Sequence, residues 1–106
     1  MKNIVLIGMP GSGKTTIGKI LAATLGRNFC DADHLLEKWE GTTIKELFAV
    51  SEENFRDAET RTIKKLAAAR DLVIATGGGV VKRPDNMELL KANGTIIFID
   101  RSPELI

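Results

Sequence analysis

One stretch near the start of the chain, Ile4-Val5-Leu6-Ile7-Gly8-Met9-Pro10-Gly11-Ser12-Gly13-Lys14-Thr15, sets its architecture. It begins with four apolar, mostly β-branched residues, which are typical of a strand buried on both faces of a parallel sheet. Residues 15–25 then place apolar side chains at helical spacing, and Gly26 can end that helix. A buried strand, a glycine-rich turn and an amphipathic helix in this order predict the start of an α/β fold.

The turn itself, Gly8–Thr15, matches the pattern G-x-x-x-x-G-K-[ST] of phosphate-binding loops (P-loops) in the context that the pattern requires. Glycines let successive backbone N–H groups surround phosphate oxygens, and the N-terminus of the following helix adds partial positive charge. Lys14 can reach the β- and γ-phosphates, and the Thr15 hydroxyl can ligate Mg²⁺. The full pattern argues against the alternative, a glycine-rich turn without a ligand. It predicts nucleotide binding but does not separate ATP from GTP.

The rest of the chain alternates between strand-like and helix-like segments. We expect strands over 28–31, 72–75 and 95–99, and helices over 33–41, from Thr42 or Thr43, from Ser51, over 84–93 and from Ser102. The order β-α-β-ααα-β-α-β predicts a P-loop NTPase-like α/β fold, with helices flanking a mainly parallel sheet of four strands. We find no internal repeat or linker, so residues 1–106 are expected to form a single domain.

Composition excludes several classes of protein. The 106 residues hold 15 lysines and arginines against 14 aspartates and glutamates, and a net charge of +1 argues against nucleic-acid binding. The single cysteine, Cys30, excludes an internal disulfide and a multi-cysteine zinc site. The apolar run at the start has four residues, too few for a signal peptide or a membrane helix. We therefore expect a reduced, cytoplasmic protein without a membrane partner.

Two acids follow the second expected strand. Asp31 and Asp33 are two residues apart, and in an extended segment both carboxylates project to the same side. Because the carboxyl ends of parallel strands form the ligand crevice, these acids should face the glycine-rich loop. One could hold Mg²⁺-bound water while the other accepts a hydrogen bond from an attacking hydroxyl. The alternative is that Asp33 caps the next helix and Asp31 is solvated.

A cation and three glycines complete the candidate site. Arg56 and Glu59 are three residues apart and share one helix face, so Glu59 could orient a guanidinium that grips a carboxylate. The alternative is an ordinary surface ion pair. Gly77-Gly78-Gly79 directly follows a buried strand and could let the backbone approach an anionic ligand closely. The alternative there is a flexible turn.

Taken together, these motifs resemble the shikimate kinase family. The resemblance rests, in the family's order, on Gly8–Thr15, Asp31-Ala32-Asp33, Phe55-Arg56-x-x-Glu59, Thr76-Gly77-Gly78-Gly79-Val80 and Asp100-x-x-Pro103-Glu104. It implies transfer of the γ-phosphoryl group of ATP to the 3-hydroxyl of shikimate, with Mg²⁺ as the metal.

The resemblance also implies a role for each matching residue. Residues 31–70 would form a substrate-binding helical region inserted between strands. Lys14 and Asp33 would be catalytic, and the ATP phosphates would be bound by Gly11, Ser12, Gly13, Lys14, Thr15 and Thr16. Thr15 and Asp31 would serve the metal, and shikimate would be bound by Asp33, Arg56, Glu59, Gly77, Gly78 and Gly79.

The sequence departs from the family pattern in two places. The segment 51–54 before Phe55 is one residue shorter than the family's, which could alter the start of that helix. The lid loop, further arginines, fifth strand and final helix of the family do not follow residue 104. We therefore expect a C-terminally incomplete domain with little activity alone. Its strand 95–99 should be exposed and favour self-association, whereas a complete member should be monomeric.

Two other functions remain open from the sequence. One is another small-molecule P-loop kinase, such as a gluconate or nucleoside kinase. The other is a non-catalytic module that binds a nucleotide or shikimate.

Overall fold

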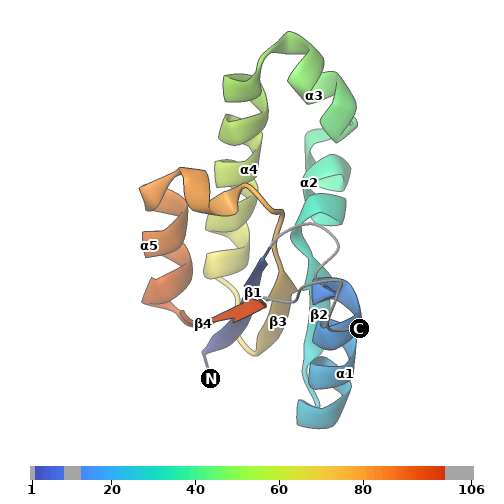
Figure 1. The fold of residues 1–106 in the computed structure, drawn as a ribbon, viewed down its shortest axis with the longest axis vertical. Coiled ribbons are helices and arrows are strands. Elements are labelled where there is room, and N and C mark those ends of the chain that lie inside the picture. Colours follow the sequence, from blue (N-terminus) through green and yellow to red (C-terminus); the bar gives the residue numbers. More distant parts are fainter. Residues whose placement is uncertain (1, 9–12, 100–106) are drawn as a thin grey trace, which may run out of the picture.

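The computed structural model describes residues 2–8 and 13–99 (Figure 1). The elements are β1 (Asn3–Gly8), α1 (Lys14–Leu25), β2 (Asn28–Asp31), α2 (Ala32–Glu40), α3 (Ile44–Val50), α4 (Glu52–Ala67), β3 (Leu72–Ala75), the 3-10 helix η1 (Val80–Lys82), α5 (Pro84–Ala92) and β4 (Gly94–Ile99). This order confirms the expected one, and η1 is an addition. The further helix expected from Ser102 lies outside the described residues.

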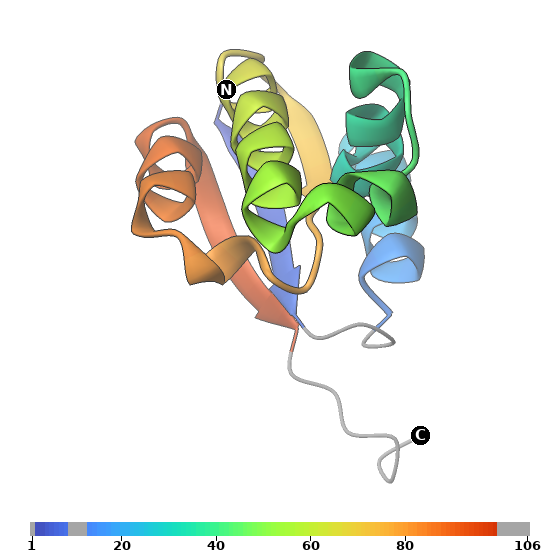
Figure 2. The same cartoon turned by 90° about the horizontal axis from the view of Figure 1, so that it is seen from above.

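The four strands form one parallel sheet in the order β2-β3-β1-β4. Side chains of β1 alternate between its faces: Val5 and Ile7 pack toward α4 and α5, whereas Leu6 packs toward α1. The sheet therefore lies between α1 on one side and α4 with α5 on the other, as Figure 2 shows from above. The predicted α/β fold, with a four-stranded parallel sheet and flanking helices, is confirmed.

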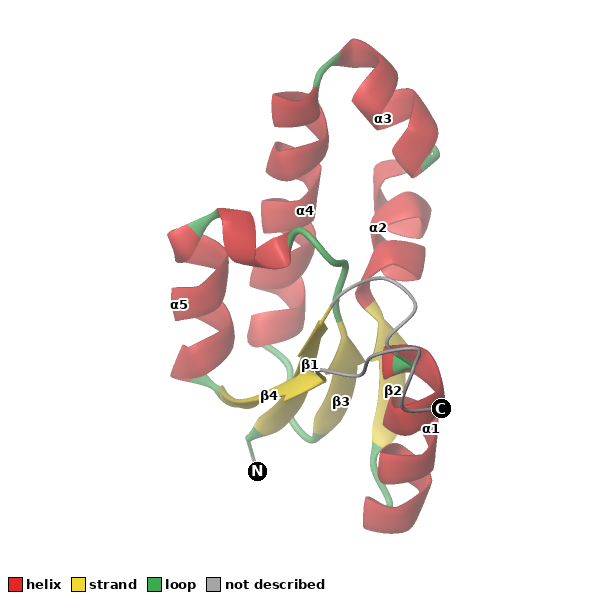
Figure 3. Ribbon diagram, viewed as in Figure 1, coloured by secondary structure: helices red, strands yellow, loops and turns green. Residues whose placement is uncertain are grey.

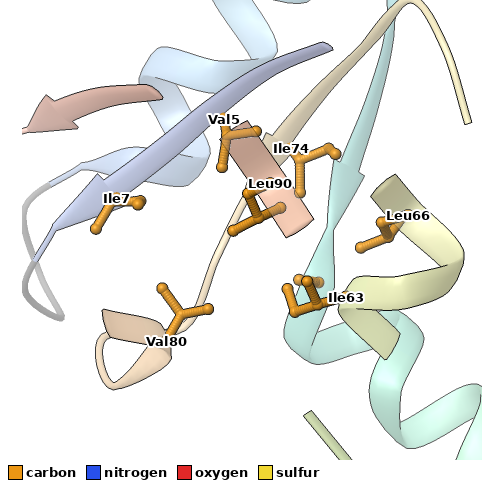
Figure 4. Close-up of a cluster of buried hydrophobic side chains, with 8 residues drawn as sticks. Val5, Ile7, Ile63, Leu66, Ile74, Val80 and Leu90 are labelled. Atoms are coloured by element: carbon orange, nitrogen blue, oxygen red, sulfur yellow. The ribbon is translucent and has the colours of Figure 1, made fainter. Parts of the chain in front are cut away.

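The main core lies between the sheet and α4 with α5 (Figure 4). It joins Val5 and Ile74 from the sheet to Ile63 and Leu90 from the helices, all at most 2% exposed. Val80 of η1 also lies in this core and is fully buried. Because Val80 directly follows the three glycines, the core holds the end of the glycine segment in place.

The chain between β2 and β3 forms a helical arm, α2–α4, that extends beyond the end of the sheet (Figure 3). A second core, made of Leu36, Leu47, Phe55 and Ala58, holds its helices together. The arm lies within residues 31–70, which were expected to form a substrate-binding insertion; that role stays a prediction. No helix within the described ranges is long and apolar enough to cross a bilayer. The cytoplasmic location stays a prediction.

Side-chain caps define where the helices of the arm begin. Thr43 caps α3 by accepting the N–H of Glu46 at 3.1 Å, and Ser51 caps α4 by accepting the N–H of Asn54 at 2.9 Å, as their positions suggested. The missing residue in 51–54 therefore does not prevent a capped start of α4.

One expectation about the two acids is wrong. Asp31 ends β2 and caps α2, because its Oδ1 atom accepts the N–H groups of Asp33 at 3.0 Å and His34 at 3.3 Å. Asp33 is already helical, so the pair does not lie in an extended segment, and Asp33 is not the capping residue. A cap at Asp31 is favourable because it satisfies backbone N–H groups that have no partner inside the helix.

Candidate active site

A pocket of about 440 Å³ opens between the helical arm and the segment that follows β3. Its lining combines charged, aromatic and glycine residues: Asp33, Ile44, Phe48, Phe55, Arg56, Glu59, Gly77, Gly78, Gly79 and Lys82. The structure thus brings together the carboxyl, the guanidinium and the three glycines that the sequence singled out. Their chemical roles stay predictions.

At one end of the pocket, Asp33 lies in the first turn of α2. Burial, and then the neighbouring Asp31 carboxylate, raise the pKa of Asp33 above its ordinary value, although Lys14 and Arg56 act in the opposite direction. Its carboxyl group lies directly against Gly77, where a Cβ atom would come 2.8 Å from Oδ1. A carboxyl group with a raised pKa is suited to accept a proton from a substrate hydroxyl.

Lys14 connects this end of the pocket to the glycine-rich loop. It is the first residue of α1, and its Nζ atom donates a hydrogen bond to the Gly8 carbonyl at the end of β1. Burial lowers the pKa of Lys14, while the negative charges of Asp33 and Asp31 oppose this effect. Both acids are therefore close enough to act on Lys14 electrostatically, as expected for side chains at the carboxyl edge of the sheet.

Of the glycine-rich loop, the structure describes Gly8 and then the part from Gly13 onward. The φ of 89° at Gly13 lies in the left-handed region, which a glycine adopts without strain. Thr15 and Thr16 follow in the first turn of α1, and both are exposed. Gly11 and Ser12, which were predicted to bind phosphate, lie outside the described residues.

At the other end, Arg56 and Glu59 of α4 form an ion pair with 3.1 Å between Nη1 and Oε1. Their side chains are only 12% and 5% exposed, so this is not an ordinary surface pair. The Arg56 guanidinium also lies 4.8 Å from the centroid of the Phe55 ring, which stacks on Phe48 with 4.4 Å between centroids. A carboxylate partner and an aromatic neighbour together hold the guanidinium still.

The ion pair leaves two polar atoms unused. Arg56 Nε and Glu59 Oε2 are buried and have no hydrogen-bond partner within the described residues. Burial raises the pKa of Glu59, and the hydrogen bond from Arg56 opposes that rise. Buried polar groups are normally paired with protein, ordered water or ligand, so these two atoms can bind a polar partner.

The glycine segment is anchored at both ends. Before it, the hydroxyl of Thr76 donates to the Leu6 carbonyl at 2.8 Å and the Thr76 N–H donates to the same atom at 3.1 Å. After it, Val80 is buried in the core. Between these anchors, a Cβ atom on Gly79 would come 2.5 Å from Nη1 of Arg56. The segment is therefore a fitted wall of the pocket and not a flexible turn.

Three pocket residues were not singled out from the sequence as site residues. Ile44 and Phe48 were assigned only to a helix face, but Phe48 is 42% exposed and lines the pocket. Lys82 has an Nζ atom 3.8 Å from the Glu52 carboxylate. The signal for Lys82 was its place three residues after the glycines; Phe48 gave none, because helical periodicity does not show which apolar residue stays uncovered.

The comparisons with known proteins agree with this geometry. The family model described as "Shikimate kinase" matches residues 10–106. A shikimate kinase of Clostridium botulinum (strain Eklund 17B / Type B) is 53% identical over 107 residues, which is 100% of this chain and 65% of the relative. The chain thus spans slightly less than two thirds of that relative's length.

Two solved structures give the same result. A shikimate kinase from Acinetobacter baumannii in complex with shikimate has a TM-score of 0.93 at 42% identity, covering 99% of this chain and 59% of that one. A shikimate kinase from Aquifex aeolicus has a TM-score of 0.87 at 36% identity, covering 97% of this chain and 62% of that one. Because the family model matches nearly all of its residues, this chain belongs to the shikimate kinase family.

Proposed function

We propose that this chain carries the phosphate and acceptor sites of a kinase that transfers the γ-phosphoryl group of ATP to the 3-hydroxyl of shikimate. One observation carries the proposal: a single pocket is lined by both the paired Arg56 guanidinium and the Asp33 carboxyl, which also interacts with Lys14. Family membership supports the reaction class, and the shikimate complex of the A. baumannii relative supports the acceptor.

The donor side is formed by the glycine-rich loop and the start of α1. We assign the ATP phosphates to Gly11, Ser12, Gly13, Lys14, Thr15 and Thr16. Lys14 is catalytic because its ammonium group would neutralise the charge that develops between the β- and γ-phosphates during transfer. The contact of Lys14 with the Gly8 carbonyl holds it at the end of β1, where the loop begins.

Mg²⁺ would be held at the same end. The described residues contain no group of three or more histidine, cysteine or acidic side chains that could hold a metal by themselves. That fits Mg²⁺, which keeps several water ligands and binds through few protein oxygens and the substrate phosphates. The Thr15 hydroxyl and the Asp31 carboxylate are oxygen donors of this kind; Asp31 uses Oδ1 for its cap, so Oδ2 would face the water shell. The ion would supply neutralisation of phosphate charge.

The acceptor side belongs to the helical region 31–70 and the glycine segment. Arg56 would bind the shikimate carboxylate, Glu59 would orient Arg56, and Gly77, Gly78 and Gly79 would contact the ring through their backbone. Asp33 would hold the hydroxyl. In the transfer, the 3-hydroxyl oxygen forms a bond to the γ-phosphorus, the bond from that phosphorus to the β–γ bridging oxygen breaks, and the hydroxyl proton passes to Asp33 while ADP leaves.

Titration of the ¹⁵N-labelled chain with shikimate tests the acceptor site. We expect saturable shifts of the Gly77, Gly78 and Gly79 amides, loss of binding in Arg56→Ala, and no response to gluconate. ³¹P NMR with protein, ATP, Mg²⁺ and shikimate at comparable concentrations detects even slow transfer, which Asp33→Asn should abolish. Equal binding of gluconate would favour another small-molecule kinase. Shikimate binding without any phosphate ester would favour a non-catalytic module.

A further inference from the structure

Three polar side chains that are not part of the pocket lining join α4 to the segment that follows the glycines. Asn86 of α5 accepts a hydrogen bond from the Thr60 hydroxyl at 2.9 Å and donates one to the Val80 carbonyl at 3.3 Å. Arg83 donates to the same Thr60 oxygen at 3.3 Å. We call Thr60, Arg83 and Asn86 the clasp.

Burial separates the Asn86 bonds of the clasp from ordinary surface contacts, whereas the Arg83 side chain is 31% exposed. Asn86 is fully buried, and Thr60 is half-buried. Arg83 adds an ion pair with Asp57 of α4, with 2.9 Å between Nη1 and Oδ1. A buried amide that lost either partner would leave an unpaired polar group, which is costly, so these bonds fix α5 and the Val80 backbone against α4.

On α4 and on the segment after the glycines, the clasp residues or their bonding partners are next to pocket residues in the sequence. On α4, Thr60 directly follows Glu59, and Asp57 directly follows Arg56. On the other segment, Val80 directly follows Gly79, whose backbone lies against the Arg56 guanidinium. The clasp therefore joins the two elements whose separation determines whether Arg56 fits against Gly79.

We propose that the clasp sets the width of the pocket, so that Thr60 and Asn86 are positioning residues for acceptor binding. They do not line the pocket, and they act through Gly79 and Arg56. The choice of shikimate as acceptor rests on the proposed function; the effect on pocket width does not. An error of about 1 Å in such a site is enough to cost substantial activity.

Thr60→Val tests the clasp, because valine keeps the shape of threonine and removes the hydroxyl. Thr60→Ser keeps the hydroxyl and should behave like the parent chain. Thr62→Val is the matched control: Thr62 lies in the same helix and is 2% exposed, but its hydroxyl donates to the Ala58 carbonyl within α4 itself.

The first measurement is amide hydrogen exchange without any ligand. The N–H groups of Val80 and Lys82 donate to the carbonyls of Gly77 and Gly79 and so report on the glycine segment. In Thr60→Val we expect their exchange to accelerate about tenfold relative to the amides of β1, as loss of one hydrogen bond to a buried group predicts. In Thr60→Ser and Thr62→Val this ratio should stay at the parent value.

The second measurement is affinity. Thr60→Val should weaken shikimate binding about tenfold and leave ATP binding unchanged, since the bonds of the clasp connect α4, η1 and α5 and not β1 or α1, which flank the glycine-rich loop. Equal acceleration of all amides, or equal effects of Thr60→Val and Thr62→Val, would overturn the clasp. If the parent chain binds no shikimate, the assigned acceptor is wrong, and the exchange ratio still decides whether the clasp holds the pocket.

Discussion

The Arg56 guanidinium lies so close to the Gly79 backbone that a Cβ atom there would come within 2.5 Å of Nη1. Real Cβ atoms do not approach other heavy atoms to that distance, so any side chain at position 79 must displace Arg56. The φ angle of Gly79 is −98°, which other residues adopt readily. Glycine at position 79 therefore keeps Arg56 in its observed place through contact and not through backbone conformation.

Gly79→Ala should weaken shikimate binding at least about tenfold with little loss of stability, because the methyl group pushes the guanidinium out of register with a carboxylate. Isothermal titration measures the affinity. In an Arg56→Ala background the same substitution should add almost nothing, which a double-mutant cycle would show as strong coupling.

Gly41→Ala supplies the control for Gly79→Ala. Gly41 has a φ of 71°, and a Cβ atom there would meet nothing within 4 Å. It should cost ~1 kcal/mol of stability through backbone strain and leave binding unchanged. If Gly79→Ala bound shikimate as tightly as the parent chain, the contact with Arg56 would have no role in acceptor binding.

Phe48 is the second pocket residue with a measurable effect. Phe48→Ala should weaken shikimate binding several-fold and cost ~1 kcal/mol of stability, because it removes the ring stacked on Phe55 beside Arg56. Val50→Ala is the matched control on the same helix, since Val50 is 75% exposed and lies outside the pocket lining. Equal affinities of the two variants would contradict an aromatic wall that positions Arg56.

Sequence patterns predicted the parts of this site that depend on topology. The carboxyl ends of parallel strands meet at one edge of a sheet, so Asp33 after β2 and Gly77 after β3 were expected at the same edge. The i,i+3 spacing of Arg56 and Glu59 likewise predicted their contact. The shared edge and the ion pair follow from element order and periodicity, whereas the direct pairing of β2 with β3 came from the structure.

Other features depend on packing that a local pattern does not contain. Asp31 and Asp33 can both cap a helix, and only the observed start of α2 shows that Asp31 does so. The bonds from Asn86 to Thr60 and Val80 require α5 to lie at one distance from α4, and no spacing in the sequence gives that distance. The hydrogen-bond partners of buried polar side chains therefore could not be predicted from the sequence pattern.

The edge strand β4 gives a prediction about association. Within the described residues β4 pairs only with β1, and Phe98 on it is 66% exposed. An unpaired edge with an apolar side chain favours pairing with another chain. We expect the parent chain to self-associate in multi-angle light scattering at high concentration and Phe98→Lys to do so less. Val50→Lys places the same charge on an exposed helix position and should not suppress association; a strictly monomeric parent chain would contradict the prediction.

Asp33→Asn should stabilise the chain at neutral pH while removing the proposed proton acceptor. Burial raises the pKa of Asp33 above its ordinary value of 3.8, so just above pH 3.8 the folded state binds more protons at this site than the unfolded state. The free energy of unfolding therefore falls as the pH rises through that window. The loss of stability caused by ionising Asp33 is complete above the raised pKa. Asparagine cannot ionise and avoids this loss. The higher stability of Asp33→Asn relative to the parent chain should therefore disappear below pH 3.8.

Glu40→Gln should change the free energy of unfolding in the opposite direction to Asp33→Asn at neutral pH. A hydrogen bond from Arg61, with 2.7 Å between Nη2 and Oε1, lowers the pKa of Glu40 below its ordinary value of 4.5. That pair stabilises the fold above pH 4.5 and loses its effect as the pH falls, so Glu40→Gln should lower stability at pH 7 by up to ~1 kcal/mol. Urea unfolding of both variants between pH 3 and 8 separates the two cases. If Asp33→Asn were less stable than the parent chain at pH 7, the Asp33 carboxyl would contribute to the stability of the fold, which would contradict the prediction. If Asp33→Asn is more stable, the buried carboxyl lowers stability, as expected for a group that is kept for catalysis.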